Sequence, residues 1–455
     1  MATTTEPMPY PARARRITDS KEFLPCLMLL ILPLGMVKEI NLIGQLFVTE
    51  LILFLLFPLF YVTSPKIKPK YDGVQLGWIG IWLLALMATD IYRGTFIGDY
   101  LRGWAKLIFL ILNFYVLRRL LTTEARLLSW LIGASIALGI FAWQEHDVLA
   151  ERWKFGVGDS ALHAVAAVVI LLGFNRQKVA PMVLGAICFG FALTSILLNS
   201  RNFFLAFFLA GCTFLACAFP ASREVLKRGW DRHFWAAVLF GFAIIYGIGT
   251  IYVTGAPQGW FGEDARLKFA EQRMEGLDPV VGVLAGGRQE FFSSSAAIAD
   301  SPIIGYGSWA RSAYYYNIYL EAIRRYASPE RIQQVEAQIP VGEPLIPVHS
   351  HIFSAWVEAG IVGAIVWVLI IREIFRAMRR SFELRSASDL LIILIAPSLL
   401  WDLLFSPLGG QLRISWAFAF VLLGFKATGG AASTTVDPKD SIQAAGSRPA
   451  PHPTR

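Results

Sequence analysis

Charged residues are scarce in this chain of 455 residues. Asp, Glu, Lys and Arg together make up 16% of the sequence, whereas soluble domains carry about 25%. Hydrophobic residues make up 55%, and the mean hydropathy is +0.53. A water-soluble fold could not bury this much apolar surface, so the composition predicts residence in a membrane.

Cysteine is also rare, with four residues in the whole chain. Cys26, Cys188, Cys212 and Cys217 all lie in apolar segments, and their spacing matches no metal-binding pattern. We therefore expect them to be small core residues that form neither a disulfide nor a metal site.

A basic domain of the kind that binds nucleic acid is missing too. The formal charge is +8, but Lys and Arg stand in short clusters between apolar runs, without interleaved aromatic residues. We therefore expect the lipid bilayer as a partner and no nucleic acid. The sequence also lacks a fixed-period repeat, the inverted halves typical of transporters, a cleavable signal peptide and a lipidation motif.

What the chain does contain is a series of long apolar runs. A helix that crosses the hydrocarbon core needs about 20 mostly apolar residues. The runs predict an all-α, polytopic integral membrane protein with about 12 transmembrane helices. These helices are expected near residues 23–38, 41–63, 74–91, 102–118, 127–144, 161–174, 179–199, 202–220, 234–254, 352–371, 388–405 and 413–425.

The distribution of Lys and Arg predicts the orientation, because short cytoplasmic loops are enriched in these residues. Basic clusters occur in alternate loops, on the side of the N-terminus, and the opposite side carries one long loop. The predicted organisation is a cytoplasmic tail (1–22), nine helices (23–254), a large extracytoplasmic loop (255–348), three helices (349–425) and a disordered cytoplasmic tail (426–455). A loop of this length is more often functional than a mere connector.

Three polar segments fall on the predicted outer face. The first is the turn between the seventh and eighth helices, where Ser200 precedes Arg201. An arginine at the membrane boundary is costly unless it snorkels or binds a partner, so Arg201 is either a snorkelling turn residue or an anion ligand.

The second segment lies in the long loop and runs from Gly286 through Arg288, then from Asp300 to Gly307. Glycines beside an arginine let its planar guanidinium approach an anion closely, and that fork suits diphosphate oxygens. Tyr306 lies within a Gly-Tyr-Gly stretch that lacks the spacing of an ATP-binding loop. The alternative interpretation is an ordinary turn after a helix.

The third segment begins at the end of the loop, where His349 and His351 precede a long apolar helix. A neutral imidazole at a water-accessible boundary can act as a general base. A His-x-His pair can equally cap a helix or bind metal, but no carboxylate or cysteine stands at a suitable spacing for metal.

Together these motifs resemble the bacterial O-antigen ligase and O-antigen polymerase superfamily. His349-Ser350, Glu358, Gly360 and Gly363 resemble that family's helix signature. The turn at Ser200-Arg201, the Gly287-Arg288 segment and the stretch from Asp300 to Gly307 resemble its other motifs, in the same order along the chain. Phe291 and Phe292 stand where members often carry a Trp.

The resemblance implies a GT-C-like membrane glycosyltransferase in the bacterial inner membrane, with a periplasmic active site. Such proteins move a glycan from undecaprenyl diphosphate to an acceptor hydroxyl, on lipid A-core or on another glycan, and use no metal or nucleotide cofactor. By resemblance, His349 deprotonates the acceptor and Arg201 and Arg288 hold the diphosphate, with inversion at the anomeric carbon. The supporting residues are Ser200, Glu358, Tyr306 and His351.

Several alternatives remain open at this stage. Glu358 could orient His349 or pair with Arg201, and Gly360 and Gly363 are expected to permit close helix packing. Asp90, Arg93 and Asp402 are lesser candidates for lining the site. The acceptor could be that of a ligase or a polymerase, and a lipid transporter or flippase is the alternative of another class.

Overall fold

The computed structural model describes residues 20–41, 44–63, 73–171, 179–198, 200–232, 234–274, 278–327, 329–339, 342–384 and 386–424. Both predicted tails therefore lie almost wholly outside the described residues. Before the long loop, the elements are α1 (Ser20–Ile31), the 3-10 helix η1 (Leu32–Met36), β1 (Glu39–Asn41), β2 (Gln45–Phe47), α2 (Val48–Thr63), α3 (Gly73–Arg93), α4 (Ile97–Leu120), α5 (Glu124–Glu145), α6 (Leu149–Arg152), the π-helical turn η2 (Trp153–Val157), α7 (Gly158–Leu171), α8 (Val179–Leu197), α9 (Arg201–Ala218), α10 (Pro220–Arg232) and α11 (Phe234–Gly255).

The second half is helical as well. Its elements are α12 (Glu263–Gln272), α13 (Pro279–Gly286), α14 (Glu290–Asp300), α15 (Ala313–Tyr326), α16 (Pro329–Glu336), α17 (His351–Ser381), α18 (Ala387–Phe405) and α19 (Leu412–Gly424). Among the described residues, seven helices are long and apolar enough to cross a membrane, and four shorter helices are apolar. An all-α membrane protein is therefore confirmed, and every predicted apolar run overlaps a helix.

Three local predictions were wrong. The helix expected from residue 41 begins at Val48, because the preceding residues form an antiparallel hairpin of β1 and β2. The basic connection after α9 is a helix, α10, and α17 continues ten residues past its expected end at residue 371. In these last two cases the helical residues are rich in charge, and a hydropathy pattern does not detect a charged helix.

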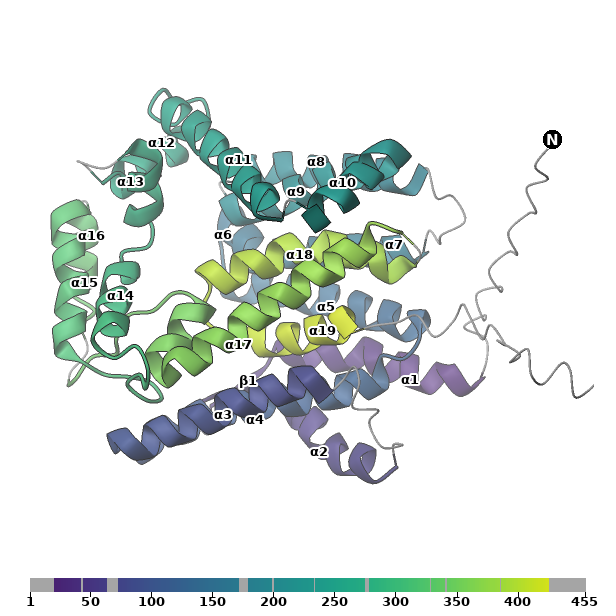
Figure 1. Cartoon of the computed structure of the whole chain (residues 1–455), viewed down its shortest axis with the longest axis horizontal. Coiled ribbons are helices and arrows are strands. Elements are labelled where there is room, and N and C mark those ends of the chain that lie inside the picture. The colour runs from purple at the N-terminus through teal and green to yellow at the C-terminus, as the bar shows by residue number, and fades with distance from the viewer. Residues whose placement is uncertain are drawn as a thin grey trace, which may run out of the picture.

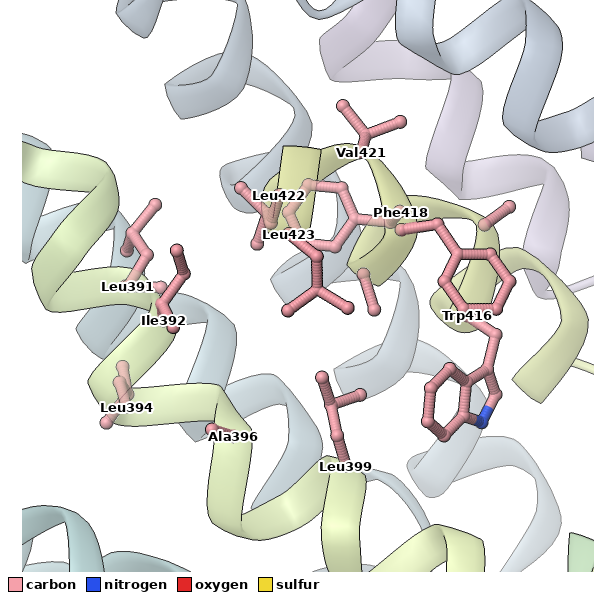
Figure 2. Close-up of a cluster of buried hydrophobic side chains, with 14 of the residues drawn as sticks. Leu391, Ile392, Leu394, Ala396, Leu399, Trp416, Phe418, Val421, Leu422 and Leu423 are labelled. Carbon is pink, nitrogen blue, oxygen red and sulfur yellow. The ribbon is translucent and has the colours of Figure 1, made fainter. Parts of the chain in front are cut away.

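The core of the bundle is built from large apolar side chains on neighbouring helices. Figure 2 shows Leu399 of α18 pointing toward the side chains of α19, among them Trp416 and Leu423. Trp416 belongs to the largest core cluster and is 1% exposed. Of the cysteines, Cys26, Cys188 and Cys217 are buried as expected, whereas Cys212 is exposed, and all four are free.

A buried ion pair joins α2 to α19. Glu50 on α2 and Arg413 on α19 meet at 2.7 Å and 2.9 Å through both carboxylate oxygens, and Asn113 on α4 donates to the same carboxylate at 3.1 Å. The Arg413 guanidinium also donates to the carbonyl of Gln45 in β2. This pair therefore fixes the hairpin to the bundle, because a buried charge is tolerated only when it is paired.

The long loop is folded. Figure 1 shows α12 to α16 gathered at one end of the bundle, outside the layer of long helices. Helix α14 packs on both α15 and α17, and α13 packs on α11 and α12. Helices α15 and α16 pack on each other.

Helix α17 is interrupted at Gly360, which has φ +65° and ψ −159°. The loop segment 303–307 lies against this break: the amide of Tyr306 donates to the Val357 carbonyl at 2.7 Å, and that of Gly307 donates to the Glu358 carbonyl at 2.9 Å. We expected Gly360 to permit close packing of two helices. Instead it marks the point where backbone groups of the loop replace the hydrogen bonds of the helix.

The end of α3 holds the same segment from the other side. Thr89 donates to the Ile304 carbonyl at 2.8 Å, and Arg93 donates to the Gly305 carbonyl at 2.9 Å. The Asp90 carboxylate accepts from both the amide and the hydroxyl of Ser308, at 2.6 Å and 2.7 Å. Asp90 and Arg93 therefore fasten the loop to the bundle.

We expect Gly360→Ala to destabilise the protein severely. An added Cβ would lie 1.9 Å from the Ile303 carbonyl oxygen, and the backbone conformation alone costs a non-glycine residue about 1–3 kcal/mol. The free energy of unfolding should fall by about 3 kcal/mol or more, measured as a lower Tm in detergent.

Gly80→Ala on α3 is the matched control, because no atom lies within 4 Å of its added Cβ. It should leave Tm unchanged or raise it slightly, as expected for alanine in a helix. An unchanged Tm in Gly360→Ala would contradict the break in α17.

Candidate functional site

The C-terminal end of α18 holds two of the predicted motifs. The last four carbonyls of a helix lack partners within the helix. Here the Leu403 carbonyl accepts from the Ser350 hydroxyl at 3.0 Å, and the Phe405 carbonyl accepts from Arg288 Nη2 at 3.5 Å. These contacts place the Gly287-Arg288 segment and the start of α17 at the same point of the bundle.

His349 lies immediately before α17 and is half-buried. Ser350 caps the helix by accepting from the Phe353 amide at 3.4 Å, so the position of His349 is set by the cap. Burial lowers the pKa of His349 below its ordinary value of 6.5, and the positive charges of Arg288 and Lys154 lower it further, whereas Glu290 raises it. The imidazole is therefore neutral at pH 7, as a general base must be.

Arg288 follows the end of α13, where Gly286 packs directly on the Gln272 carbonyl of α12. Its Nη1 donates to the Gly287 carbonyl at 2.9 Å. Burial lowers the pKa of the Arg288 guanidinium, Glu290 raises it and the charge of Arg201 lowers it. Arg288 thus lies within electrostatic range of both Arg201 and His349.

Arg201 is the first residue of α9. Its Nη2 donates to the Tyr252 hydroxyl at 2.7 Å, and its guanidinium carbon lies 4.3 Å from the centroid of that ring. The Tyr252 hydroxyl in turn donates to the Ala265 carbonyl of α12 at 3.3 Å. Tyr252 therefore joins α9, α11 and α12 and restrains the Arg201 side chain.

Two lysines complete the cluster, and sequence reasoning missed both. Lys154 lies on the π-helical turn η2 and Lys268 on α12. Burial lowers the pKa of Lys268 to about 8, with further lowering by Arg201, Lys154 and Arg288, while Glu271 raises it. Both lysines lie on the predicted outer face, where the positive-inside rule predicts few basic residues. Their presence there is the feature that could have identified them from the sequence.

These residues form what we call the cation cluster: Lys154, Arg201, Lys268 and Arg288, with His349 beside it. None of the four cations forms an ion pair with a carboxylate in the described part of the chain. The Nε atoms of Arg201 and Arg288 are buried without a hydrogen-bond partner there. Cations that repel one another and remain unpaired at a partly buried position are suited to bind an anion.

The other predicted residues have structural contacts. Ser200 is buried, and its hydroxyl donates to the Asn202 side chain at 2.8 Å. The Tyr306 hydroxyl lies 2.5 Å from that of Tyr315, which donates to Asp300 at 2.7 Å. Tyr306 therefore stabilises the loop segment, and its contacts lead away from the cation cluster.

Glu358 pairs with neither Arg201 nor His349, contrary to expectation. Its carboxylate accepts from Lys106 Nζ on α4 at 2.7 Å. His351 is fully buried, its Nδ1 donates to the Ser406 carbonyl, and its ring packs against Trp367 and Trp416. Both residues therefore secure the start of α17.

The remaining candidates are structural as well. Asp402 accepts from the Ser406 hydroxyl at 3.0 Å, at the end of α18. Within the described residues, no group of three or more His, Cys, Asp or Glu side chains is placed to hold a metal ion. No protein-family model, no curated protein and no solved structure matches this chain.

Proposed function

We propose that the chain is a membrane glycosyltransferase of the O-antigen ligase type. It transfers a glycan from undecaprenyl diphosphate to an acceptor hydroxyl of lipid A-core or a similar glycan. The observation that carries the proposal is the cation cluster, whose four positive groups lack carboxylate partners among the described residues and lie beside a neutral imidazole. A diphosphate supplies the missing negative charge.

The residues account for a complete reaction in the proposed site. The His349 imidazole accepts the proton of the acceptor hydroxyl as the oxygen attacks the anomeric carbon. The bond from that carbon to the diphosphate oxygen breaks on the opposite face, which inverts the configuration, and the diphosphate leaves with the electron pair. Arg201, Arg288, Lys154 and Lys268 stabilise the charge that develops on it. No metal or nucleotide cofactor takes part.

The proposal includes the topology. Eleven apolar helices among the described residues, together with α11, make up 12 transmembrane helices. Both termini face the cytoplasm of a bacterial inner membrane, and the cation cluster faces the periplasm. The charge bias of the connecting segments supports this orientation.

A polymerase of O-antigen, capsule or exopolysaccharide repeats is the second candidate, because the same donor chemistry serves either acceptor. Analysis of glycans in a deletion strain separates the two. Loss of a ligase leaves long unattached polymer, whereas loss of a polymerase leaves single repeats.

A lipid flippase is a candidate of another class, and one observation favours it: interrupted helices such as α17 occur in transporters. In this chain, however, loop backbone fills the interruption, and the unpaired cations gather elsewhere. Glycan transfer by the purified protein in detergent, where no second compartment exists, would exclude transport as its sole activity.

We expect His349→Ala to lower the transfer rate by about 100-fold or more, the usual contribution of a general base. Transfer from purified lipid-linked donor is measured by gel, and Tm is measured in parallel. His146→Ala is the matched control: His146 is a half-buried histidine that does not act on the pKa of His349. Near-wild-type transfer in His349→Ala would remove the base assignment.

Arg201→Lys and Arg288→Lys should each weaken binding of inorganic pyrophosphate by about tenfold or more, because an ammonium group does not replace a bidentate guanidinium. Isothermal titration calorimetry measures the affinity. Arg266→Lys is the control, since Arg266 is exposed on α12 and already paired with Glu263. Unchanged affinity in both cluster variants would argue against the diphosphate site.

The pKa of Lys268, lowered to about 8, predicts a pH dependence. Lys268 attracts an anion only while it is protonated, so its contribution is present below about pH 8 and is lost as the pH rises through that value. The ratio of wild-type to Lys268→Gln pyrophosphate affinity should be largest near pH 7 and approach one at about pH 9.5. A ratio that stays constant with pH would show that protonation of Lys268 does not contribute to pyrophosphate binding.

A further inference from the structure

The folded loop contains a cavity of about 650 Å³ that no sequence motif predicts. Its walls come from α12, from the turn between α13 and α14 with the first residue of α14, and from α16 with the residues on either side of it. The volume lies within the range of small-molecule sites, about 300–1,000 Å³. The cavity lies in the part of the molecule that Figure 1 shows outside the bundle.

Four glutamine side chains lie on the wall of this cavity, and none of its described lining residues is aromatic or a large aliphatic residue. Gln272, Gln289 and Gln333 line it together with Glu271, Glu290 and Lys268. An amide offers both donors and an acceptor, and a carboxylate offers acceptors only. Such a wall suits a molecule covered with hydroxyl groups and does not suit a lipid chain.

The Gln272 side chain carries an unsatisfied polar atom at this wall. Its Oε1 is buried and accepts no hydrogen bond within the described residues. An unsatisfied buried acceptor is costly, and a ligand hydroxyl would satisfy it. The two glutamates outnumber the single lysine on the wall, which favours an uncharged ligand over an anionic one.

The cavity adjoins the cation cluster. Lys268 lines the cavity and is acted on by the charges of Arg201 and Arg288. Gly287 also lines it and directly precedes Arg288, while Glu290 lines it and raises the pKa of His349. One end of a molecule bound in the cavity would therefore lie next to the proposed diphosphate position and next to His349.

We propose that this cavity is a saccharide subsite that holds an uncharged, polyhydroxylated sugar next to the diphosphate. The inference rests on the proposed function, because the glycan of the donor is bonded directly to the lipid diphosphate. The sugar belongs either to the donor, bonded to the diphosphate, or to the acceptor that attacks it. Both sources share the chemistry that the amides recognise.

The test uses Gln272→Ala and Gln333→Ala in the full chain in detergent, with Gln338→Ala as the matched control. Gln338 is an exposed glutamine just beyond the end of α16 and does not line the cavity. One probe is the saccharide released by mild acid from the lipid-linked fraction of the producing strain. The other is the deacylated core oligosaccharide of the same strain. Saturation-transfer NMR titrations measure both affinities, and calorimetry measures inorganic pyrophosphate binding.

Each cavity variant should weaken binding of one saccharide by about fivefold to tenfold, the effect of one lost hydrogen bond. Pyrophosphate affinity should stay within about twofold of wild type, which also shows that the variants are folded. Loss for the released saccharide assigns the cavity to the donor, and loss for the core oligosaccharide assigns it to the acceptor.

Wild-type affinity for both saccharides in both variants, or no saccharide binding by the wild type, would overturn the subsite. Normal pyrophosphate binding in that case would leave the proposed function intact. Conversely, a wild-type protein that fails to bind pyrophosphate contradicts the proposed function, whatever the saccharide titrations show.

Discussion

The carbonyl groups at the end of α18 are the constraint on which the site depends. A helix that ends inside a protein must have its last carbonyls satisfied by other groups. In this molecule the donors are Ser350, Arg288 and His351, to the carbonyls of Leu403, Phe405 and Ser406. The long loop and the start of α17 are therefore fixed to one helix terminus. The same terminus carries a partial negative charge, which favours the guanidinium of Arg288.

A second backbone contact makes the loop part of the bundle. The segment 303–307 supplies donors to the carbonyls that the break at Gly360 leaves free, and α3 binds the opposite side of that segment. Irregular backbone inside a membrane protein is tolerated where protein groups satisfy it, as they do here. These contacts fix the segment 303–307 to both α17 and α3.

Much of this structure could be predicted from the sequence. The apolar runs gave a helix in every case, because membrane-spanning length is a strong and local signal. The sequence singled out Arg201 as an arginine at the membrane boundary, Arg288 as an arginine beside flexible glycines, and His349 as a histidine before a long apolar helix. The structure brings Arg288 into electrostatic range of both Arg201 and His349.

What could not be predicted depends on contacts between distant parts of the chain. Glu358 pairs with Lys106, which is 252 residues away in sequence, whereas the sequence left His349 and Arg201 as its candidate partners. Glycines three residues apart are typical of close helix packing, and only the neighbouring loop reveals that Gly360 is a break. Lys154 and Lys268 are each unremarkable in sequence, and their importance arises from the convergence of η2 and α12 on Arg201.

The electrostatic environment of His349 bears on both halves of the proposed reaction. Burial and the charges of Arg288 and Lys154 favour the neutral imidazole, which is ready to accept a proton. The same environment disfavours the imidazolium that forms when the acceptor is deprotonated. The departing diphosphate carries new negative charge beside this imidazolium and is the nearest proton acceptor that the reaction creates. Transfer of the proton to the diphosphate would restore the neutral base and weaken the hold of the cation cluster on the product. In the proposed reaction the cations would therefore have two effects, since they would bind the donor before transfer and favour the return of the neutral base after it.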